Sequence, residues 1–298
     1  MQTARHPPTE DRSLHSRGWR GSLSLKYTAV AGRTRAHDLH EGPLRVLQAL
    51  YPEGPGICHH VMVHPPGGIV GGDVLQIQAD VGADSHALIT TPAATRFYRS
   101  DGRESSQSAL LRVAAGARLE WLPLEAIAYP GCAAHNAVRA ELAPGAQMIG
   151  WDVLALGLPR SEQNFVDGKN AAGGWFCQHL ELPGVWIERG RIAASDHRLL
   201  TSPLALAGHN VMATLWFAAG EKLPGAQREQ LLDAARELSQ VHALSAAAGS
   251  TSLQQRGVVL RVLAHSVEPA MELLQQVRAA WRQLAWGLAA LPPRVWRL

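Results

Sequence analysis

The chain has 298 residues, of which 46% are hydrophobic and 18% charged, and this balance excludes an intrinsically disordered protein. Its net charge of +3 comes without a Lys/Arg stripe, so we expect no nucleic-acid partner. The cysteines, Cys58, Cys132 and Cys177, are too far apart to form a zinc knuckle or a disulfide framework. Isolated cysteines fit a reducing cytoplasm, and we therefore expect a cytoplasmic protein.

The N-terminal segment and one uncharged segment bear on targeting. Residues 1–18 are polar and lack the apolar core of a secretory signal, so they predict a flexible tail before a single β-rich domain over residues 19–298. Residues 199–220 carry no charged side chain and are long enough to span a bilayer. Because Pro203 and the GHN turn interrupt them, they predict two buried strands joined by a turn, and no membrane partner.

The body of the chain has the pattern of an all-β protein. In GSLSLKYTAV (21–30) apolar and polar residues alternate, which is typical of a half-buried strand. The turns VGADSHA (81–87), AAGARLE (114–120) and APGAQMI (143–149) resemble one another, which predicts stacked layers as in a β-helix or a broad sandwich. Similar short strands are predicted at 44–50, 57–63, 74–81, 86–91, 108–113, 118–122, 125–129, 135–142, 147–156, 175–182, 185–193, 211–218 and 258–264.

Two amphipathic helices are predicted towards the C-terminus, at residues 224–244 and 268–290. Packing against a sheet is the usual explanation for such helices, and docking of a partner protein is the alternative. The second helix and the residues after it are rich in Trp and Arg, which are enriched in interface hot spots. The candidates for partner binding are therefore Arg278, Trp281, Arg282, Trp286, Arg294 and Trp296.

The glycine-rich stretch HPPGGIVGGD (64–73) is the first candidate site. Asp73 stands where a phosphate-binding P-loop requires Lys, and the strand that follows excludes a dinucleotide-binding fingerprint. No G-x-S-x-G elbow accompanies it, so an oxyanion hole has no nucleophile. What remains is a turn between two strands, in which Asp73 is the chemically active group.

Potential metal donors lie on the next candidate strand, CHHVMVH (58–64). Cys58, His60, Met62 and His64 share one face of that strand and are donors that transition metals accept. Side chains two residues apart lie about 7 Å apart, so one strand alone cannot close a coordination site. Two interpretations therefore remain: the segment is a mixed strand with buried Cys and Met side chains, or it makes a weak contact with a metal ion.

Carboxylates in apolar strands are the third feature. A buried charge must be paired, hydrated or functional, so each carboxylate has two interpretations. Ion pairs with Arg96, Arg99 or Arg189 are the first, and a water-filled polar passage for a divalent cation is the second. The carboxylates concerned are Asp73, Glu120, Glu125, Asp152 and Glu188.

Several motifs in this order resemble the urease accessory proteins of the D type. They are HPPGGIVGGD, TTPAATRFYRSDG (90–102), LEWLPLEAIAYPG (119–131), DHRLLTSPLALAGHNVMATLWFA (196–218) and PRVWRL, and together they cover the chain from Trp19 to Arg297. One departure is GLPRSEQNF, in which Leu158 and Gln163 stand where the family commonly has Arg and Glu. A role of that Arg or Glu in relatives does not transfer to these positions.

The resemblance implies a scaffold or chaperone and not an enzyme. Such proteins bind the urease apoprotein and the F-type accessory protein, and through it the G-type GTPase. They help to deliver nickel to the urease active site and hold no tightly bound cofactor, and a tunnel is a proposed route for nickel(II) in transit. The family fold is β-helix-like with two helices. The nickel-transit candidates are then Asp73, Asp152, Glu125 and Glu188.

A hydrolase on a β-rich fold is the alternative function. It would use carboxylates such as Asp73 and Glu125 in a closed pocket, with pKa values pushed apart by their environment. The missing H-E-x-x-H motif and nucleophile elbow favour the scaffold.

Overall fold

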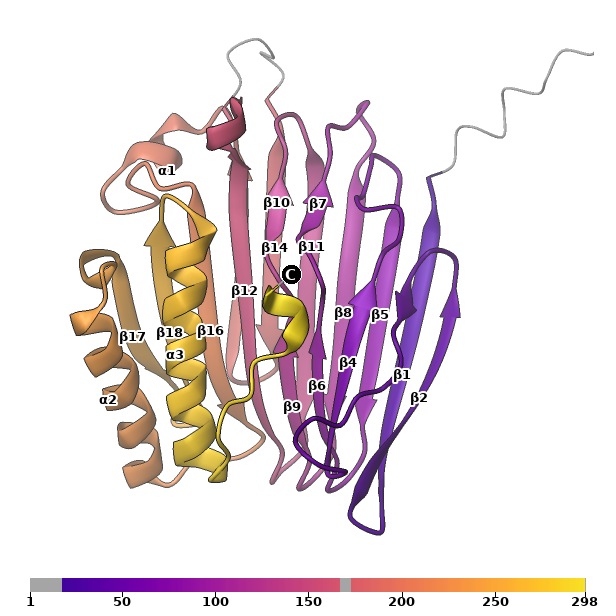
Figure 1. Ribbon diagram of the computed structural model, residues 1–298. Helices are drawn as coiled ribbons and strands as arrows, with labels where there is room; N and C mark the ends of the chain where they lie inside the picture. Colours follow the sequence, from indigo (N-terminus) through magenta and orange to yellow (C-terminus); the bar gives the residue numbers. More distant parts are fainter. Residues whose placement is uncertain (1–17, 167–172, 298) are drawn as a thin grey trace, which may run out of the picture.

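The computed structural model describes residues 18–166 and 173–297, and within them two stacked β-sheets dominate (Figure 1). The first sheet has seven strands in the order β15–β14–β11–β8–β5–β1–β2. They are β1 Arg20–Val30, β2 Arg33–Glu41, β5 Val74–Val81, β8 Ser105–Val113, β11 Ala133–Leu142, β14 Trp175–Leu182 and β15 Trp186–Ala193.

The second sheet has eleven strands within the same ranges. Its main path is β17–β18–β16–β12–β9–β6–β4–β3. Off this path, β10 and β13 pair with β12, and β7 pairs with β10. The strands are β3 Arg45–Val46, β4 Ile57–Val63, β6 His86–Thr90, β7 Thr95–Phe97, β9 Arg118–Leu122, β10 Ala126–Ala128, β12 Gln147–Leu158, β13 Gln163–Asn164, β16 Val211–Ala219, β17 Ala248–Leu253 and β18 Gly257–Ala264.

The chain passes back and forth between the sheets, so that successive coils stack. Strands β5, β8, β11 and β14 pair in parallel in one sheet, and β4, β6, β9 and β12 do so in the other. The three similar turns connect β5 to β6, β8 to β9 and β11 to β12. Asp84, Gly116 and Gly145 in them share a positive φ. The prediction of a mainly β, stacked architecture is confirmed.

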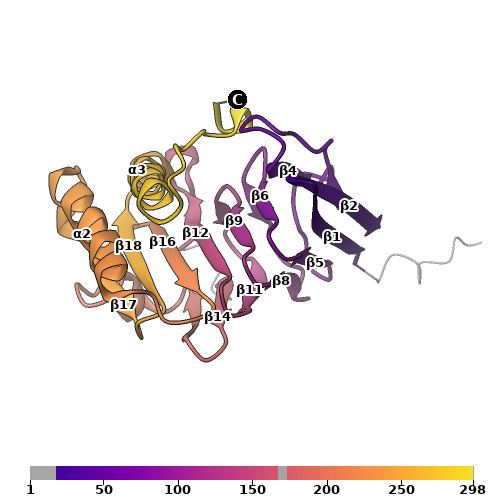
Figure 2. The same ribbon diagram turned by 90° about the horizontal axis from the view of Figure 1, so that it is seen from below.

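Helices cover the outer face of the larger sheet (Figure 2). Helix α2 (Gly225–Val241) packs on β17 and β18, and helix α3 (Val267–Trp286) packs on β16 and β18. Their apolar faces enclose a second core beside the one between the sheets. Helix α3 ends earlier than predicted because Gly287 caps it in the left-handed conformation. Short 3₁₀ turns lie at Pro159–Ser161, Ser245–Ala247 and Arg294–Arg297. No helix of the described ranges has both the length and the apolar character that crossing a membrane requires.

The prediction for residues 199–220 is half wrong. Strand β16 lies at its C-terminal half, but its N-terminal half contains a third helix, α1 (His197–Thr201), and turns. Asp196 caps α1 by accepting a hydrogen bond from the Leu199 amide at 2.9 Å, and Pro203 has no N–H to give to a sheet. The cap and the proline therefore decide the local structure.

Other differences concern short or exposed strands. The strand predicted at residues 44–50 is limited to β3 and one bridge from Leu50 to His59. Strand β2 was not predicted because it is an exposed edge strand with no apolar face. Strands β7, β13 and β17 are short or made of small polar residues, which leaves no alternation to detect. The tail predicted for residues 1–18 lies, apart from Gly18, outside the described residues.

The glycine-rich stretch is the predicted turn between β4 and β5. Gly67 and Gly72 have φ values of +77° and +95°, which L side chains rarely adopt. Gly68 lies under the ring of Tyr98, where a Cβ would come within 2.0 Å of a ring carbon. The stretch therefore owes its composition to backbone geometry and close packing.

Candidate functional site

A row of polar side chains crosses the core between the two sheets. Gln107 on β8, Asn136 on β11 and Gln178 on β14 occupy paired positions of three neighbouring strands. The Gln107 amide donates to Asn136 at 3.4 Å, and the Asn136 amide donates to Gln178 at 3.3 Å. From the facing sheet, Asp152 on β12 accepts a hydrogen bond from the Gln178 amide. The alignment follows from the in-register stacking of parallel strands, which places equivalent side chains side by side.

Two cavities follow this row. A cavity of about 330 Å³ is lined by Met62, His64 and Arg96, among others, and a smaller one of about 30 Å³ reaches Asn136 and Asp152. The residues that line both cavities are Thr95, Gln107, Trp121 and Pro123. Because they share these walls, the cavities adjoin, and the space along the row extends from His64 and Arg96 to Asp152.

Asp152 is the titrating group of the row. Burial raises the pKa of Asp152 to about 7, the negative charge of Glu188 adds to this rise, and the hydrogen bond from Gln178 opposes it. Near neutral pH both the carboxylic acid and the carboxylate are therefore populated. As a carboxylate, such a side chain can bind a divalent cation through its oxygens, and as a carboxylic acid it releases the cation.

The far end of the row lies where strands β15 and β18 face one another. Asp152, Thr214 and Arg261 are paired across β12, β16 and β18. Glu188 lies on β15, and both of its carboxylate oxygens accept hydrogen bonds from Arg261. Nη1 of Arg261 donates to Oε1 at 2.8 Å, and Nη2 donates to Oε2. The side chains of Glu188 and Arg261 are 32% and 45% exposed, so solvent reaches this end. Of the four carboxylates predicted as nickel-transit candidates, the structure thus brings two, Asp152 and Glu188, close together.

Asp73 has a different environment. Its Oδ1 accepts a hydrogen bond from the Trp19 amide at 2.7 Å and its Oδ2 one from the Val70 amide at 3.0 Å. The side chain is buried and lines neither of the two cavities on the row. These contacts tie the start of β1 to the glycine-rich turn, and they give Asp73 a structural part.

Replacing Asp73 with alanine is expected to lower the free energy of unfolding by about 1–3 kcal/mol, because two backbone N–H groups lose their acceptors. Asp73→Asn should cost less, since its carbonyl oxygen can still accept one of the bonds. Urea unfolding monitored by tryptophan fluorescence measures both. An Asp73→Ala protein that unfolds at the same urea concentration as the unmodified chain would contradict the structural assignment.

Glu125 is bonded to the wall of the larger cavity, because its carbonyl oxygen accepts a hydrogen bond from the Thr95 amide at 2.8 Å. Burial raises its pKa, the charge of Glu268 at the start of α3 adds to the rise, and Arg96 lowers it. Arg96 also lines the larger cavity. Asp73 and Glu125, the pair that the hydrolase alternative requires, take part in separate sets of contacts.

The donors on β4 do not assemble into a metal centre. Burial raises the pKa of the Cys58 thiol to about 11, and Nδ1 of His60 is hydrogen-bonded to Tyr27 at 2.8 Å. Met62 and His64 do line the larger cavity. Among the described residues, no group of three or more His, Cys, Asp or Glu side chains could hold a metal ion.

The prediction that the arginines and tryptophans of α3 face a partner is wrong for most of them. Arg278, Trp281 and Arg282 are at most 1% exposed and Trp286 is 8% exposed. Helix α3 turns this face towards the sheet, and the indole N–H of Trp281 donates to the Leu231 carbonyl at 2.8 Å. Packing against a sheet, the usual explanation for such helices, holds instead. Arg294 remains exposed.

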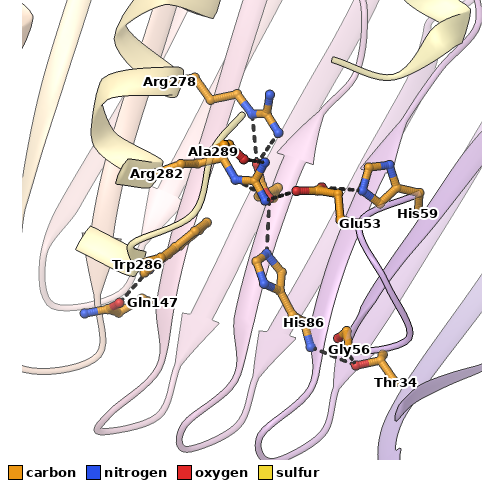
Figure 3. Close-up of polar contacts among 11 residues, drawn as sticks. Thr34, Glu53, Gly56, His59, His86, Gln147, Arg278, Arg282, Trp286 and Ala289 are labelled. Carbon is orange, nitrogen blue, oxygen red and sulfur yellow. Dashed lines mark hydrogen bonds and ion pairs between the residues drawn. The ribbon is translucent and has the colours of Figure 1, made fainter. Parts of the chain in front are cut away.

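The arginines tolerate burial because carboxylates meet them (Figure 3). Glu120 on β9 is fully buried and lies 2.6 Å from Arg278, 3.3 Å from Arg282 and 3.1 Å from the imidazole of His86. Arg282 also reaches Glu53 at 2.8 Å. Burial alone would raise the pKa of Glu120, but Arg278, His86 and Arg282 outweigh it and hold that pKa at about 2. The cluster fastens α3 to the sheet.

Further contacts hold the residues after α3. Trp286 donates to Gln147 at 2.7 Å, and the half-buried Trp296 donates to Thr90 at 2.8 Å. Glu120 was recognised in the sequence as a charge inside an apolar strand. The ion-pair interpretation is correct for it, but its partners are Arg278 and Arg282 and not the arginines that were expected. Gln107, Asn136 and Gln178 were missed because neutral amides stand out little in a sequence. The sequence feature that could have revealed them is a polar residue at a position of each strand whose alternation predicts that it faces the core.

Comparison with known proteins gives one consistent result. Residues 19–297 match the UreD urease accessory protein family. A urease accessory protein UreD of Polaromonas sp. (strain JS666) is 56% identical over 280 residues, which cover 94% of this chain and 99% of the relative. The protein of the same name from Leptothrix cholodnii is 56% identical over 281 residues with the same coverage. That of Methylibium petroleiphilum is 52% identical, again over 94% of this chain and 99% of the relative.

Proposed function

Since the chain belongs to the UreD urease accessory protein family, we propose that it is a non-catalytic scaffold in urease maturation that passes nickel(II) along the polar row between its sheets. Its partners in this proposal are the urease apoprotein, the F-type accessory protein and, through the latter, the G-type GTPase. Nickel(II) is its cargo and not a resident cofactor. The cytoplasm is the proposed location.

The observation that carries the transit proposal is the row itself. Gln107, Asn136, Gln178 and Asp152 cross a core that is mostly apolar, and cavities adjoin them. Buried polar groups cost stability unless they are satisfied, so a continuous row of them is unusual in a core that only needs to be packed. Function is the simplest reason for it.

The donor set suits transit better than storage. Amide and carboxylate oxygens and the imidazole of His64 are ligands that a divalent transition metal accepts. They follow one another along the row and do not converge on one point. Passage through a protein requires sites that bind strongly enough to admit an ion and weakly enough to release it. A closed set of three or four ligands would retain nickel.

Replacing Asp152 with alanine is expected to lower the nickel content of urease about tenfold at limiting nickel, a loss usual when a group near a metal is removed. The chain, urease and the F-type and G-type proteins are co-expressed, the complex is purified by a tag on this chain, and metal is measured by mass spectrometry. The complex itself should stay intact.

Asp80→Ala is the matched control. Asp80 is an aspartate on a strand of the other sheet, its side chain is 37% exposed, and its partner is Arg112 on the outer face. It should leave nickel content unchanged. Unchanged nickel in the Asp152 variant would refute the transit route, and a chain that captures neither urease nor the F-type protein would refute the scaffold.

A further inference from the structure

The end of the row at Asp152 and Glu188 contains a positive charge that the transit of a cation does not require. Arg261 lies over the Glu188 carboxylate and donates to both of its oxygens. A guanidinium stays protonated at any physiological pH, and its forked geometry matches a carboxylate. A divalent cation that approaches Glu188 therefore meets a competitor already in place.

Arg261 has a second resting place beside its carboxylate partner. Its guanidinium carbon lies 5.7 Å from the ring centre of Trp186, which is two residues before Glu188 on the same strand. Aromatic faces attract guanidinium groups. The ion pair is exposed, and exposed ion pairs are weak. The ring therefore remains an attractive neighbour for Arg261 when its contact with Glu188 is broken.

A buried hydrogen-bond donor points to an oxygen-bearing occupant in the same region. The indole N–H of Trp216 is buried, and none of the described residues accepts a hydrogen bond from it. It lies over Gly150, where a Cβ would come within 2.9 Å of the indole nitrogen. Gly150 and Asp152 share a face of β12, because side chains alternate along a strand. An oxygen of a hydrated cation at Asp152 would satisfy this donor.

We propose that Arg261 is a tethered counter-ion, which prevents the Asp152–Glu188 end of the row from retaining nickel(II). The proposal rests on the proposed function, because it concerns the same passage. With Arg261 in place, Asp152, Glu188 and Arg261 together carry at most one net negative charge. Without Arg261 the two carboxylates carry up to two negative charges, and a divalent cation would bind more tightly and leave more slowly. Arg261 thereby makes this end a point of release.

The test is Arg261→Gln in the full chain, with nickel binding measured by isothermal titration and nickel transfer measured in the co-expressed complex. We expect the dissociation constant for nickel to fall about tenfold, in the range found when groups around a metal site are changed. Nickel should accumulate on the chain, and the nickel content of urease should fall. Arg261→Lys retains the charge and should behave like the unmodified chain.

Arg112→Gln is the matched control, since the Arg112 side chain is also 45% exposed and also pairs with carboxylates, Asp80 and Glu141, on a strand. It should change neither measurement. Because both arginines are exposed, unfolding midpoints should stay close to that of the unmodified chain. Arg261→Met, which keeps the apolar stem, replaces Arg261→Gln if the latter is unstable.

The outcomes separate the two proposals. If Asp152→Ala impairs nickel transfer and Arg261→Gln changes neither affinity nor transfer, the passage stands and the counter-ion proposal is wrong. Tighter binding with faster transfer would also overturn it, because Arg261 would then be a barrier to entry. If Asp152→Ala leaves transfer unchanged, the proposed passage fails, and the counter-ion proposal fails with it.

Discussion

Glu120→Gln is expected to lower the free energy of unfolding by about 3–5 kcal/mol, because it leaves two buried guanidinium groups without their shared carboxylate. Arg278 and Arg282 are at most 1% exposed and cannot turn to solvent without moving α3 off the sheet. The amide of glutamine keeps one acceptor but no charge. Urea unfolding, monitored by the fluorescence of the buried tryptophans, measures the loss.

Glu181→Gln is the control for this prediction. Glu181 is also a strand glutamate paired with an arginine, Arg139, but its pair is exposed on the outer face and should contribute less than about 1 kcal/mol. A double variant, Glu120→Leu with Arg278→Leu, should cost less than the sum of its single changes, because the two groups are coupled. If Glu120→Gln lowers the free energy of unfolding by less than Glu181→Gln does, the ion-pair cluster around Glu120 does not fasten α3 to the sheet.

The same cluster predicts sensitivity to acid. The pKa of Glu120 is about 2 in the folded chain, below its ordinary value of 4.5. The unfolded chain therefore takes up the proton first as the pH falls. The stabilisation by Glu120 is complete above pH 4.5 and is lost as the pH falls towards 2. The unfolding midpoint of the unmodified chain should drop across this range, and that of Glu120→Gln should drop less.

Asp152→Asn is expected to stabilise the chain at pH 8 while it impairs nickel transfer. The pKa of Asp152 is about 7 in the folded chain, above its ordinary value of 3.8. Between these values the folded chain holds a proton that the unfolded chain has lost, so the stability of the unmodified chain falls as the pH rises. Asparagine removes this dependence and still accepts the bond from Gln178.

The gain in the free energy of unfolding should be about 1–3 kcal/mol at pH 8 and close to zero at pH 4. Partial exposure of Asp152 to solvent keeps the gain at pH 8 in this range. Unfolding curves at four pH values between 4 and 8 measure it, and Asp80→Asn on the outer face should show no such trend. Nickel transfer by the unmodified chain should rise between pH 6 and 8, as the proton leaves Asp152. An Asp152→Asn protein whose stability gain does not grow with pH would contradict the assignment.

A residue that costs stability at the pH at which it works is typical of functional sites. Glu120 and Asp152 are both carboxylates in apolar strands, yet the structure separates them. Both are buried, which raises a carboxyl pKa. At Glu120 two arginines and His86 outweigh burial and its pKa falls, whereas at Asp152 a second carboxylate, Glu188, adds to the effect of burial and its pKa rises. The charge of the neighbours therefore decides which carboxyl stays ionised and which one takes up a proton near neutral pH.

Local patterns in the sequence determined most of the fold. The alternation in GSLSLKYTAV predicted β1, with Leu23, Leu25 and Tyr27 buried, and the similar small-Gly-small turns predicted stacked layers. These features depend on neighbours a few residues apart, which a single sequence contains. The ordered motifs likewise identified the family, and Asp152 and Glu188 were recognised as charges in apolar strands.

Contacts between distant segments were decided by the tertiary structure. Glu120 and Arg278 are 158 positions apart, and no local pattern shows that they meet. The row of Gln107, Asn136 and Gln178 arises from the register of three parallel strands, which depends on the length of every loop between them. Burial of Arg278 and Arg282 depends in the same way on the carboxylates that face them. The sequence therefore determined the layers and the family, and the pairing of strands and charges determined where the polar row and the buried ion-pair cluster lie.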